Sequence, residues 1–228
     1  MSLKKYSELD IDYLVERLRF VTQPFSIPMS VQIAQQYPGN PFPVLVSCLL
    51  SLQAQDKVTL PIAQKLSVLA PTPEKLLQIS LPELEAMICS INYYKTKARS
   101  LHVVSHTLIE RFGGQVPGNL KDLLFIKGIG LKTANLVLAE GFGIPAICVD
   151  THVHRICNVW GMVQTEDPEQ TEAELRKILP QKYWIEWNRL LVMVGQNLCK
   201  KKFECAQYCV LADLCLQSLK KEASSLKC

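Results

Sequence analysis

Residues 120–142 read LKDLLFIKGIGLKTANLVLAEGF and contain the strongest indication of how this chain folds. A short apolar helix is expected to end at Ile126, the turn KGIG follows at 127–130, and a second helix begins at about Leu131. Two glycines around one aliphatic residue let the backbone take unusual angles and let a large ligand approach it. The exposed amides at the start of the second helix favour an anion such as a nucleic-acid phosphate. Because G-x-G alone is a weak signal, a plain helix–turn–helix connection that binds nothing stays open as the alternative.

A lysine follows this turn at an electrostatically unfavourable position. Lys132 is expected in the first turn of the second helix, where the helix dipole repels a cation. This repulsion, together with partial burial, would favour the neutral amine, which is a nucleophile that forms Schiff bases. The alternative is a solvated lysine that contacts a phosphate.

The second candidate group is a carboxylate. Asp150 ends the apolar run ICV and precedes an apparent helix, which it is expected to cap. At the mouth of a cleft the same carboxylate could stabilise a developing cation or take up a proton. In the same helix, His152 is either structural or functional, and Arg155 could contact Asp150 or a phosphate.

Four of the nine cysteines lie within residues 199–215, with the spacing C-x5-C-x3-C-x5-C. Four thiolates so close together can surround one metal centre, and the gaps of three and five favour an iron–sulfur cubane over a structural zinc, which stays open. The expected ligands are Cys199, Cys205, Cys209 and Cys215. The first loop contains Lys200, Lys201 and Lys202, which form either a solvated turn or an edge that contacts phosphates.

Helix signals recur along the chain, whereas alternating strand patterns are not found, so we predict an all-α fold. Ser80 and Glu83 fit a capping box, and residues 43–55 are apolar almost all round, which favours a buried helix. The net charge of +4 does not by itself indicate nucleic acid. No apolar run reaches the length of a membrane span, about 20 residues. The N-terminus lacks the apolar core of a signal peptide, so we expect a protein of the bacterial cytoplasm.

Three of these features resemble, in the same order, the endonuclease III family of helix–hairpin–helix DNA glycosylases. The family has L-P-G-[VI]-G-x-K-T-A where this chain reads IKGIGLKTA at 126–134, and V-D-T-H-V-x-R where it reads VDTHVHR at 149–155. Four cysteines follow in both. The resemblance, which extends from about Phe42 to Cys215, implies that Lys132 is the nucleophile and that Asp150 assists it. The expected DNA contacts in these motifs are Lys127, Gly128, Gly130, His152 and Arg155.

Two further stretches resemble family loops that enter DNA. LLSLQAQD at 49–56 implies that Gln53 fills the gap left by an extruded base, and INYYKTKA at 91–98 puts Tyr93 at the position of an apolar wedge. The chain departs from the family at Lys127, where the family has proline, and at Asn92, which replaces a glycine and still tolerates a left-handed backbone. The family cysteine spacing is C-x6-C-x2-C-x5-C, so the second cysteine lies one place earlier here.

The resemblance implies two helical domains with a DNA cleft between them. Residues 34–144 would form a six-helix domain containing the hairpin, and residues 1–33 with 145–228 a second domain holding a 4Fe-4S cluster at 199–215. The protein would be a monomeric bifunctional glycosylase and AP lyase. It would act on duplex DNA with oxidised pyrimidines or abasic sites, flip the damaged base out and cleave the 3′ side by β-elimination. The alternatives are a monofunctional mismatch glycosylase, a non-catalytic DNA-binding module and a zinc-stabilised helical protein.

Overall fold

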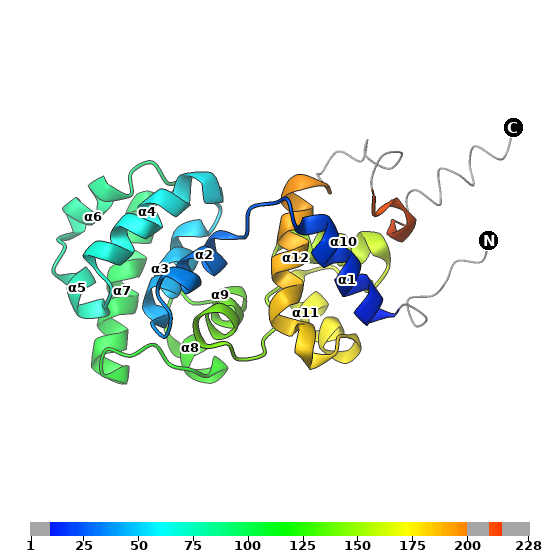
Figure 1. Cartoon of the computed structure of the whole chain (residues 1–228). Coiled ribbons are helices and arrows are strands. Elements are labelled where there is room, and N and C mark those ends of the chain that lie inside the picture. The colour runs from blue at the N-terminus through cyan, green and yellow to red at the C-terminus, as the bar shows by residue number, and fades with distance from the viewer. Residues whose placement is uncertain (1–9, 200–209, 216–228) are drawn as a thin grey trace, which may run out of the picture. The chain divides into compact units, whose positions relative to one another are not determined.

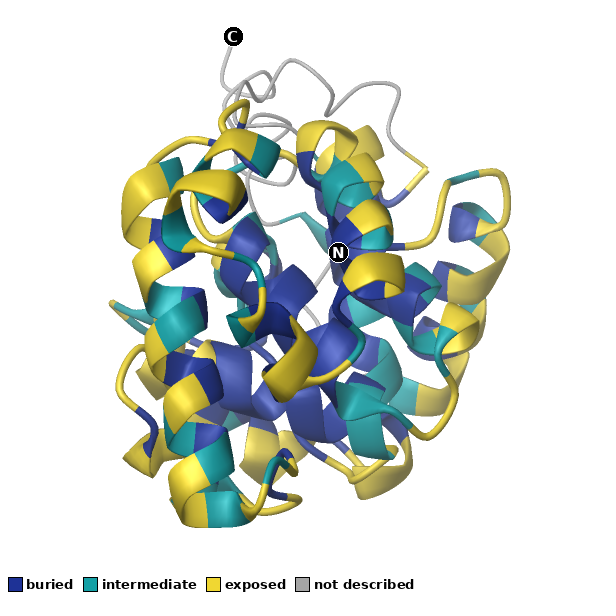
Figure 2. Cartoon of the chain, turned by 90° about the vertical axis from the view of Figure 1, so that its left-hand side faces the viewer, coloured by how far each residue is buried: buried dark blue, intermediate teal, exposed yellow. Residues whose placement is uncertain are grey.

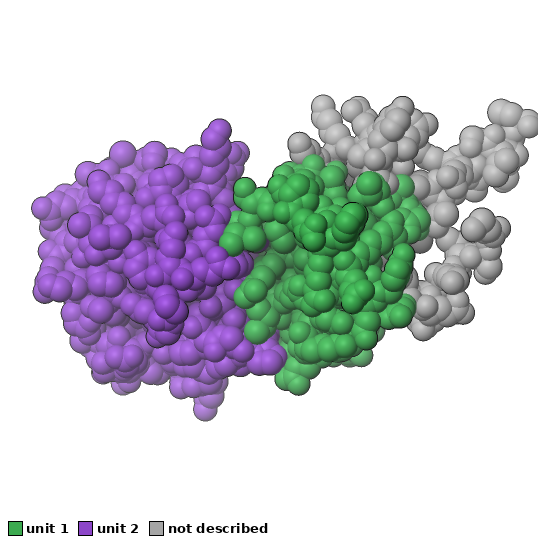
Figure 3. Space-filling model, in the orientation of Figure 1, with its two compact units in different colours: residues 1–27, 149–228 green, residues 28–148 purple. Residues whose placement is uncertain are grey.

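The computed structural model describes residues 10–199 and 210–215 of the chain (Figure 1). Within these ranges it contains helices and turns and no strand, so the predicted all-α class is confirmed. The chain divides into two compact units, residues 1–27 with 149–228 (unit 1) and residues 28–148 (unit 2), coloured in Figure 3. The sequence had grouped residues 28–33 and 145–148 with unit 1. Residues 28–33 belong to unit 2 here because α2 (Met29–Gln36) packs against α3 (Pro41–Ser51). Residues 145–148 belong to it because the Ile147 carbonyl accepts a hydrogen bond from Asn135 of the same unit.

Unit 2 is built around α3, which is buried at every residue from Phe42 to Leu50. A helix that is apolar all round is stable only when other elements cover it. The predicted buried helix is therefore present, but it ends at Ser51, so that residues 52–55 form a turn. Figure 2 shows the buried ribbon in the interior of this unit. The elements that contact α3 are α2, α4 (Asp56–Leu69), α7 (Tyr94–Phe112), α9 (Leu131–Leu136) and the π-helical turn η2 (Val137–Gly141).

Short helices complete unit 2. Helices α5 (Pro73–Leu77) and α6 (Leu81–Met87) pack against α7, and α8 (Leu120–Phe125) packs against α9. The predicted capping box starts α6: Ser80 Oγ accepts from the Glu83 amide and the Glu83 carboxylate accepts from the Ser80 amide. These bonds satisfy backbone donors that the first turn of a helix cannot pair.

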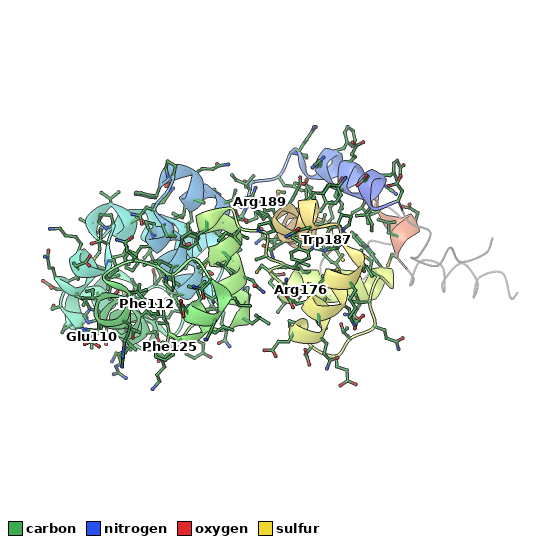
Figure 4. The ribbon with its side chains drawn as sticks, turned by 90° about the horizontal axis from the view of Figure 1, so that it is seen from below. Glu110, Phe112, Phe125, Arg176, Trp187 and Arg189 are labelled. Carbon is green, nitrogen blue, oxygen red and sulfur yellow. The ribbon has the colours of Figure 1, made fainter. Side chains whose placement is uncertain are left out.

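Unit 1 contains α1 (Ile11–Thr22), α10 (Thr151–Trp160), α11 (Pro168–Ile178) and α12 (Trp184–Asn197), with the short turns η3 (Gln181–Tyr183) and η4 (Ala212–Leu214). Helix α12 contacts α1 and α10, and its Trp187, labelled in Figure 4, is fully buried. Arg19 of α1 donates to both carboxylate oxygens of Glu186 on α12 at 2.7 Å. Arg17 bonds Asp213 at 2.7 Å and thereby links α1 to residues 210–215.

None of the described helices is long and apolar enough to cross a membrane.

A glycine allows α10 and α12 to approach closely in unit 1. A Cβ atom placed on Gly195 of α12 would lie 2.3 Å from Nδ1 of His152 on α10. That distance is far inside van der Waals contact, and Gly195 itself is buried. The His152 ring therefore packs directly on the backbone of α12.

We expect Gly195→Ala to destabilise the protein, although an alanine in a helix interior normally stabilises it by roughly 1 kcal/mol relative to glycine. The added methyl group would displace the His152 ring or push α10 away, at a cost of roughly 1–3 kcal/mol. Urea unfolding measures the difference. Gly118→Ala is the matched control, because a Cβ there lies 3.5 Å from Phe142, an ordinary contact. Equal or greater stability of Gly195→Ala would contradict the packing described here.

Candidate active site

The hairpin lies where the sequence predicts it. Helix α8 ends at Phe125, α9 begins at Leu131, and Gly128 has a φ of 100°, a conformation that favours glycine. Ile129 is 5% exposed and its amide donates to the Ile126 carbonyl at 3.0 Å, so this side chain anchors the turn. A Cβ on Gly128 or Gly130 would meet no atom within 4 Å. The outer face of the turn, with the exposed Lys127, is therefore open to a ligand.

Lys132 lies in the first turn of α9, and its side chain is exposed. Partial burial, which would favour the neutral amine, is therefore not observed, and the buried residues of α9 are Thr133 to Asn135. Burial raises the pKa of the Cys48 thiol on α3 to about 12, and the charge of Lys132 acts in the opposite direction.

The backbone of the lysine-bearing helix is anchored on its inner side. The buried Asn135 donates from Nδ2 to the Ile147 carbonyl at 3.0 Å, and the Cys148 thiol approaches the Lys132 carbonyl at 3.6 Å. The helix then widens into η2, where a Cβ on Gly141 would lie 3.0 Å from Pro41 Cβ at the start of α3. Such π-helical turns frequently occur at functional sites. Lys132 is thus an exposed side chain on a backbone that is held at several points.

Asp150 caps α10 in unit 1. One oxygen, Oδ1, accepts from the amides of His152 and Val153, both at 2.9 Å. The predicted N-cap is therefore present, and the half-buried carboxylate keeps its second oxygen for another partner. Lys132 belongs to unit 2 and Asp150 to unit 1.

Arg155 bonds Cys199 and not Asp150, which was one of the two partners considered from the sequence. Its guanidinium donates to Cys199 Sγ at 3.0 Å and to the Cys199 carbonyl at 2.6 Å, and it lies 3.5 Å from His152 Nδ1. Both side chains are half-buried. The motif at 149–155 therefore joins, within unit 1, the capping aspartate to the first of the predicted metal ligands.

The cysteine site is only partly described. Cys199 and Cys215 are half-exposed, whereas Cys205, Cys209, Lys200, Lys201 and Lys202 lie outside the described residues. Among the described residues no group of three His, Cys, Asp or Glu side chains is placed to hold a metal ion. A guanidinium that donates to Cys199 Sγ suits a thiolate ligand, so the described part of the donor set fits a metal cluster.

The structure brings the two predicted DNA-entering loops together. Gln53 and Tyr93 have φ values of 53° and 59°, and they are the only described residues other than glycine with positive φ. Both are exposed, and Asn92 Nδ2 lies 3.4 Å from the Gln53 carbonyl oxygen. Asn92 would tolerate a left-handed backbone, but the residue that takes this conformation is Tyr93, at which the chain turns into α7.

The sequence did not predict the structural roles of three residues, Lys97, Asn135 and Gly195. Lys97 is 7% exposed and donates from Nζ to the Leu50 carbonyl at 2.7 Å. Its spacing of four from Leu101 places it on the apolar face of α7, and this is a signal that could have identified it. Asn135 and Gly195 gave no local signal, since both act through distant partners.

The family model that describes an HhH-GPD superfamily base excision DNA repair protein matches residues 46–181. Endonuclease III of Thermotoga maritima is 39% identical over 81% of this chain and 89% of its own length. Endonuclease III of Escherichia coli K12 is 34% identical over 78% of this chain and 84% of its own. A trapped endonuclease III–DNA covalent intermediate has a TM-score of 0.82 and 29% identity, covering 97% of this chain and all of that chain. The chain therefore belongs to the endonuclease III family within the HhH-GPD superfamily of base excision DNA repair proteins.

Proposed function

We propose that this DNA glycosylase and AP lyase removes oxidised pyrimidines from duplex DNA, with Lys132 as the nucleophile. Membership of the endonuclease III family gives the enzyme class. The observation that carries the assignment of the residue is the exposed Lys132 amine on a helix start anchored by Asn135 and Cys148. A nucleophile must be held in place and still reach its target, and this arrangement meets both requirements.

The reaction would proceed by displacement of the base, formation of a Schiff base and β-elimination. Neutral Lys132 Nζ attacks C1′ while the bond from C1′ to the base breaks, and the base leaves with the electron pair and takes up a proton. Nitrogen then loses one proton and forms a double bond to C1′, while the bond from C1′ to O4′ breaks and O4′ takes up that proton, so that the opened sugar is a protonated Schiff base. Removal of a C2′ proton then expels the 3′ phosphate, and water releases the product. Asp150, whose second oxygen is not used in capping α10, would stabilise positive charge at C1′ and help to transfer protons.

The DNA would be held largely through its backbone. The open amides of Gly128 and Gly130 and the exposed Lys127 support phosphate binding at the hairpin. Gln53 and Tyr93, exposed and adjacent, support entry into the duplex where the base has been extruded. His152 and Arg155 are half-buried and bonded within unit 1, which favours an indirect role in shaping the DNA-binding face.

We further propose a structural 4Fe-4S cluster on Cys199, Cys205, Cys209 and Cys215. The cluster, when bound, would fix the course of the loop at 199–215. Arg155 supports this assignment, because a guanidinium near a ligand sulfur stabilises the thiolate form.

The active form is proposed to be a monomer in a bacterial cytoplasm. One chain supplies both Lys132 and Asp150, so that no second copy is needed to complete the pair. Light scattering of the enzyme on duplex DNA would contradict this if two chains bound each lesion.

Borohydride trapping on duplex DNA with one oxidised pyrimidine tests the nucleophile. The wild-type protein is expected to form a covalent adduct, because borohydride reduces the Schiff base, and Lys132→Ala is expected to form none. Lys121→Ala is the matched control, since it removes an exposed lysine from the neighbouring α8. An adduct with Lys132→Ala would assign the chemistry to another amine. No adduct with any variant, in protein with intact cluster, would leave a monofunctional glycosylase.

Arg155→Met is expected to weaken retention of the cluster by about 10- to 100-fold, because the outer partner of a metal ligand is lost. Iron and sulfide per protein after a challenge with chelator, together with the brown absorbance, measure this loss. Arg111→Met, which removes an exposed arginine from α7, is the control. Unchanged iron content in Arg155→Met would show that the contact with Cys199 does not support the cluster, and a zinc content would reject the iron–sulfur assignment.

A further inference from the structure

Unit 2 contains a buried lysine, Lys97, that has no role in the proposed catalytic steps. Lys97 is 7% exposed, and burial lowers the pKa of its ammonium group. Removing a lysine from water is unfavourable unless its polar end is bonded. Its Nζ donates to the Leu50 carbonyl at 2.7 Å, in a buried environment.

The acceptor explains why a lysine is needed there. Leu50 lies in the last turn of α3, where helix carbonyls have no partner within the helix. The last turn of most helices is solvated, but α3 is buried from Phe42 to Leu50. Lys97 therefore supplies to the end of α3 a hydrogen bond that water does not provide.

The same lysine is tied to both DNA-entering loops. Its backbone amide donates to the Tyr93 carbonyl at 3.0 Å, and its side chain bonds Leu50, three residues before Gln53. A second link is exposed: Asn92 Nδ2 lies 3.4 Å from the Gln53 carbonyl oxygen. One buried link and one exposed link thus join the turn that carries Gln53 to the turn that carries Tyr93.

We propose that Lys97, supported by Asn92, is a positioning residue that fixes the spacing between Gln53 and Tyr93, so that both enter the duplex at one lesion. This proposal rests on the proposed function. Positive φ values at residues with side chains are strained and persist only where their surroundings hold them. Without the two links, each turn could relax separately. Gln53 and Tyr93 would then no longer be held at the separation needed to enter the duplex at the same extruded base.

The test compares trapping rates at an abasic site in duplex DNA and in single-stranded DNA, because only the duplex requires a gap to be filled. Lys97→Met keeps the apolar stem and removes the donor, and we expect it to slow trapping on the duplex by roughly tenfold. Trapping on the single strand should stay within about twofold of the wild type, since Lys132 is untouched. Lys97→Arg, which keeps a cationic donor, should restore much of the duplex rate. Lys65→Met controls for the loss of one positive charge at an exposed site.

A second measurement does not depend on chemistry. A fluorescent adenine analogue opposite the abasic site brightens when it is unstacked, and we expect a smaller increase with Lys97→Met than with the wild type. If Lys97→Met fails to fold, Asn92→Ala alters only an exposed side chain, and it should lower the duplex rate and the fluorescence with no change on the single strand.

Equal losses on duplex and single strand, or a lower melting temperature with unchanged duplex trapping and fluorescence, would overturn the positioning role. Wild-type protein that traps neither substrate but still brightens the analogue in a Lys97-dependent way would instead reject the Lys132 mechanism and retain the role of Lys97.

Discussion

Helix α3 is buried on all sides, and this burial determines much of what surrounds it. A helix satisfies its own backbone groups except at its ends, so a buried helix needs donors at its carboxyl end from elsewhere in the chain. Lys97 meets that requirement at Leu50, and by doing so it brings the start of α7 to the end of α3. The two exposed turns at Gln53 and Tyr93 lie next to each other as a consequence of packing in the core.

The other end of α3 supports the lysine-bearing helix in a comparable way. Gly141 of η2 lies against Pro41, where no larger residue would fit without displacement, and Asn135 bonds the strand-like segment that leads to Cys148. A short helix such as α9 is marginal by itself, and tertiary contacts supply most of its stability. Lys132 can therefore stay exposed while the backbone that carries it is held in place by Asn135 and Cys148. The local rule that disfavours a cation at a helix start is broken at this residue, as is common at functional sites.

Local signals allowed most of the fold to be predicted from the sequence. The hairpin, the capping box at Ser80 and the N-cap at Asp150 each depend on residues within a few positions of one another. The buried helix was also predictable from its composition, although not its end at Ser51, which depends on the turn that follows. The contacts that were missed join residues far apart in the chain, as Arg155 does with Cys199. Nothing in the sequence near Arg155 or Cys199 specifies this pair, since arginine and cysteine each occur in many other environments.

The left-handed residues show how a local expectation is altered by tertiary structure. Asparagine tolerates positive φ better than tyrosine, yet Tyr93 takes this conformation and the neighbouring Asn92 does not. The cost of such a conformation is of order 1–3 kcal/mol, which one hydrogen bond to the neighbouring turn and one to the core can offset. Asn92 then has its side chain directed to the Gln53 carbonyl, and Tyr93 has its ring in solvent, 68% exposed. The exposed ring of Tyr93 adds little to the stability of the fold, and the proposed insertion into duplex DNA would account for a large aromatic side chain on a strained backbone at this turn.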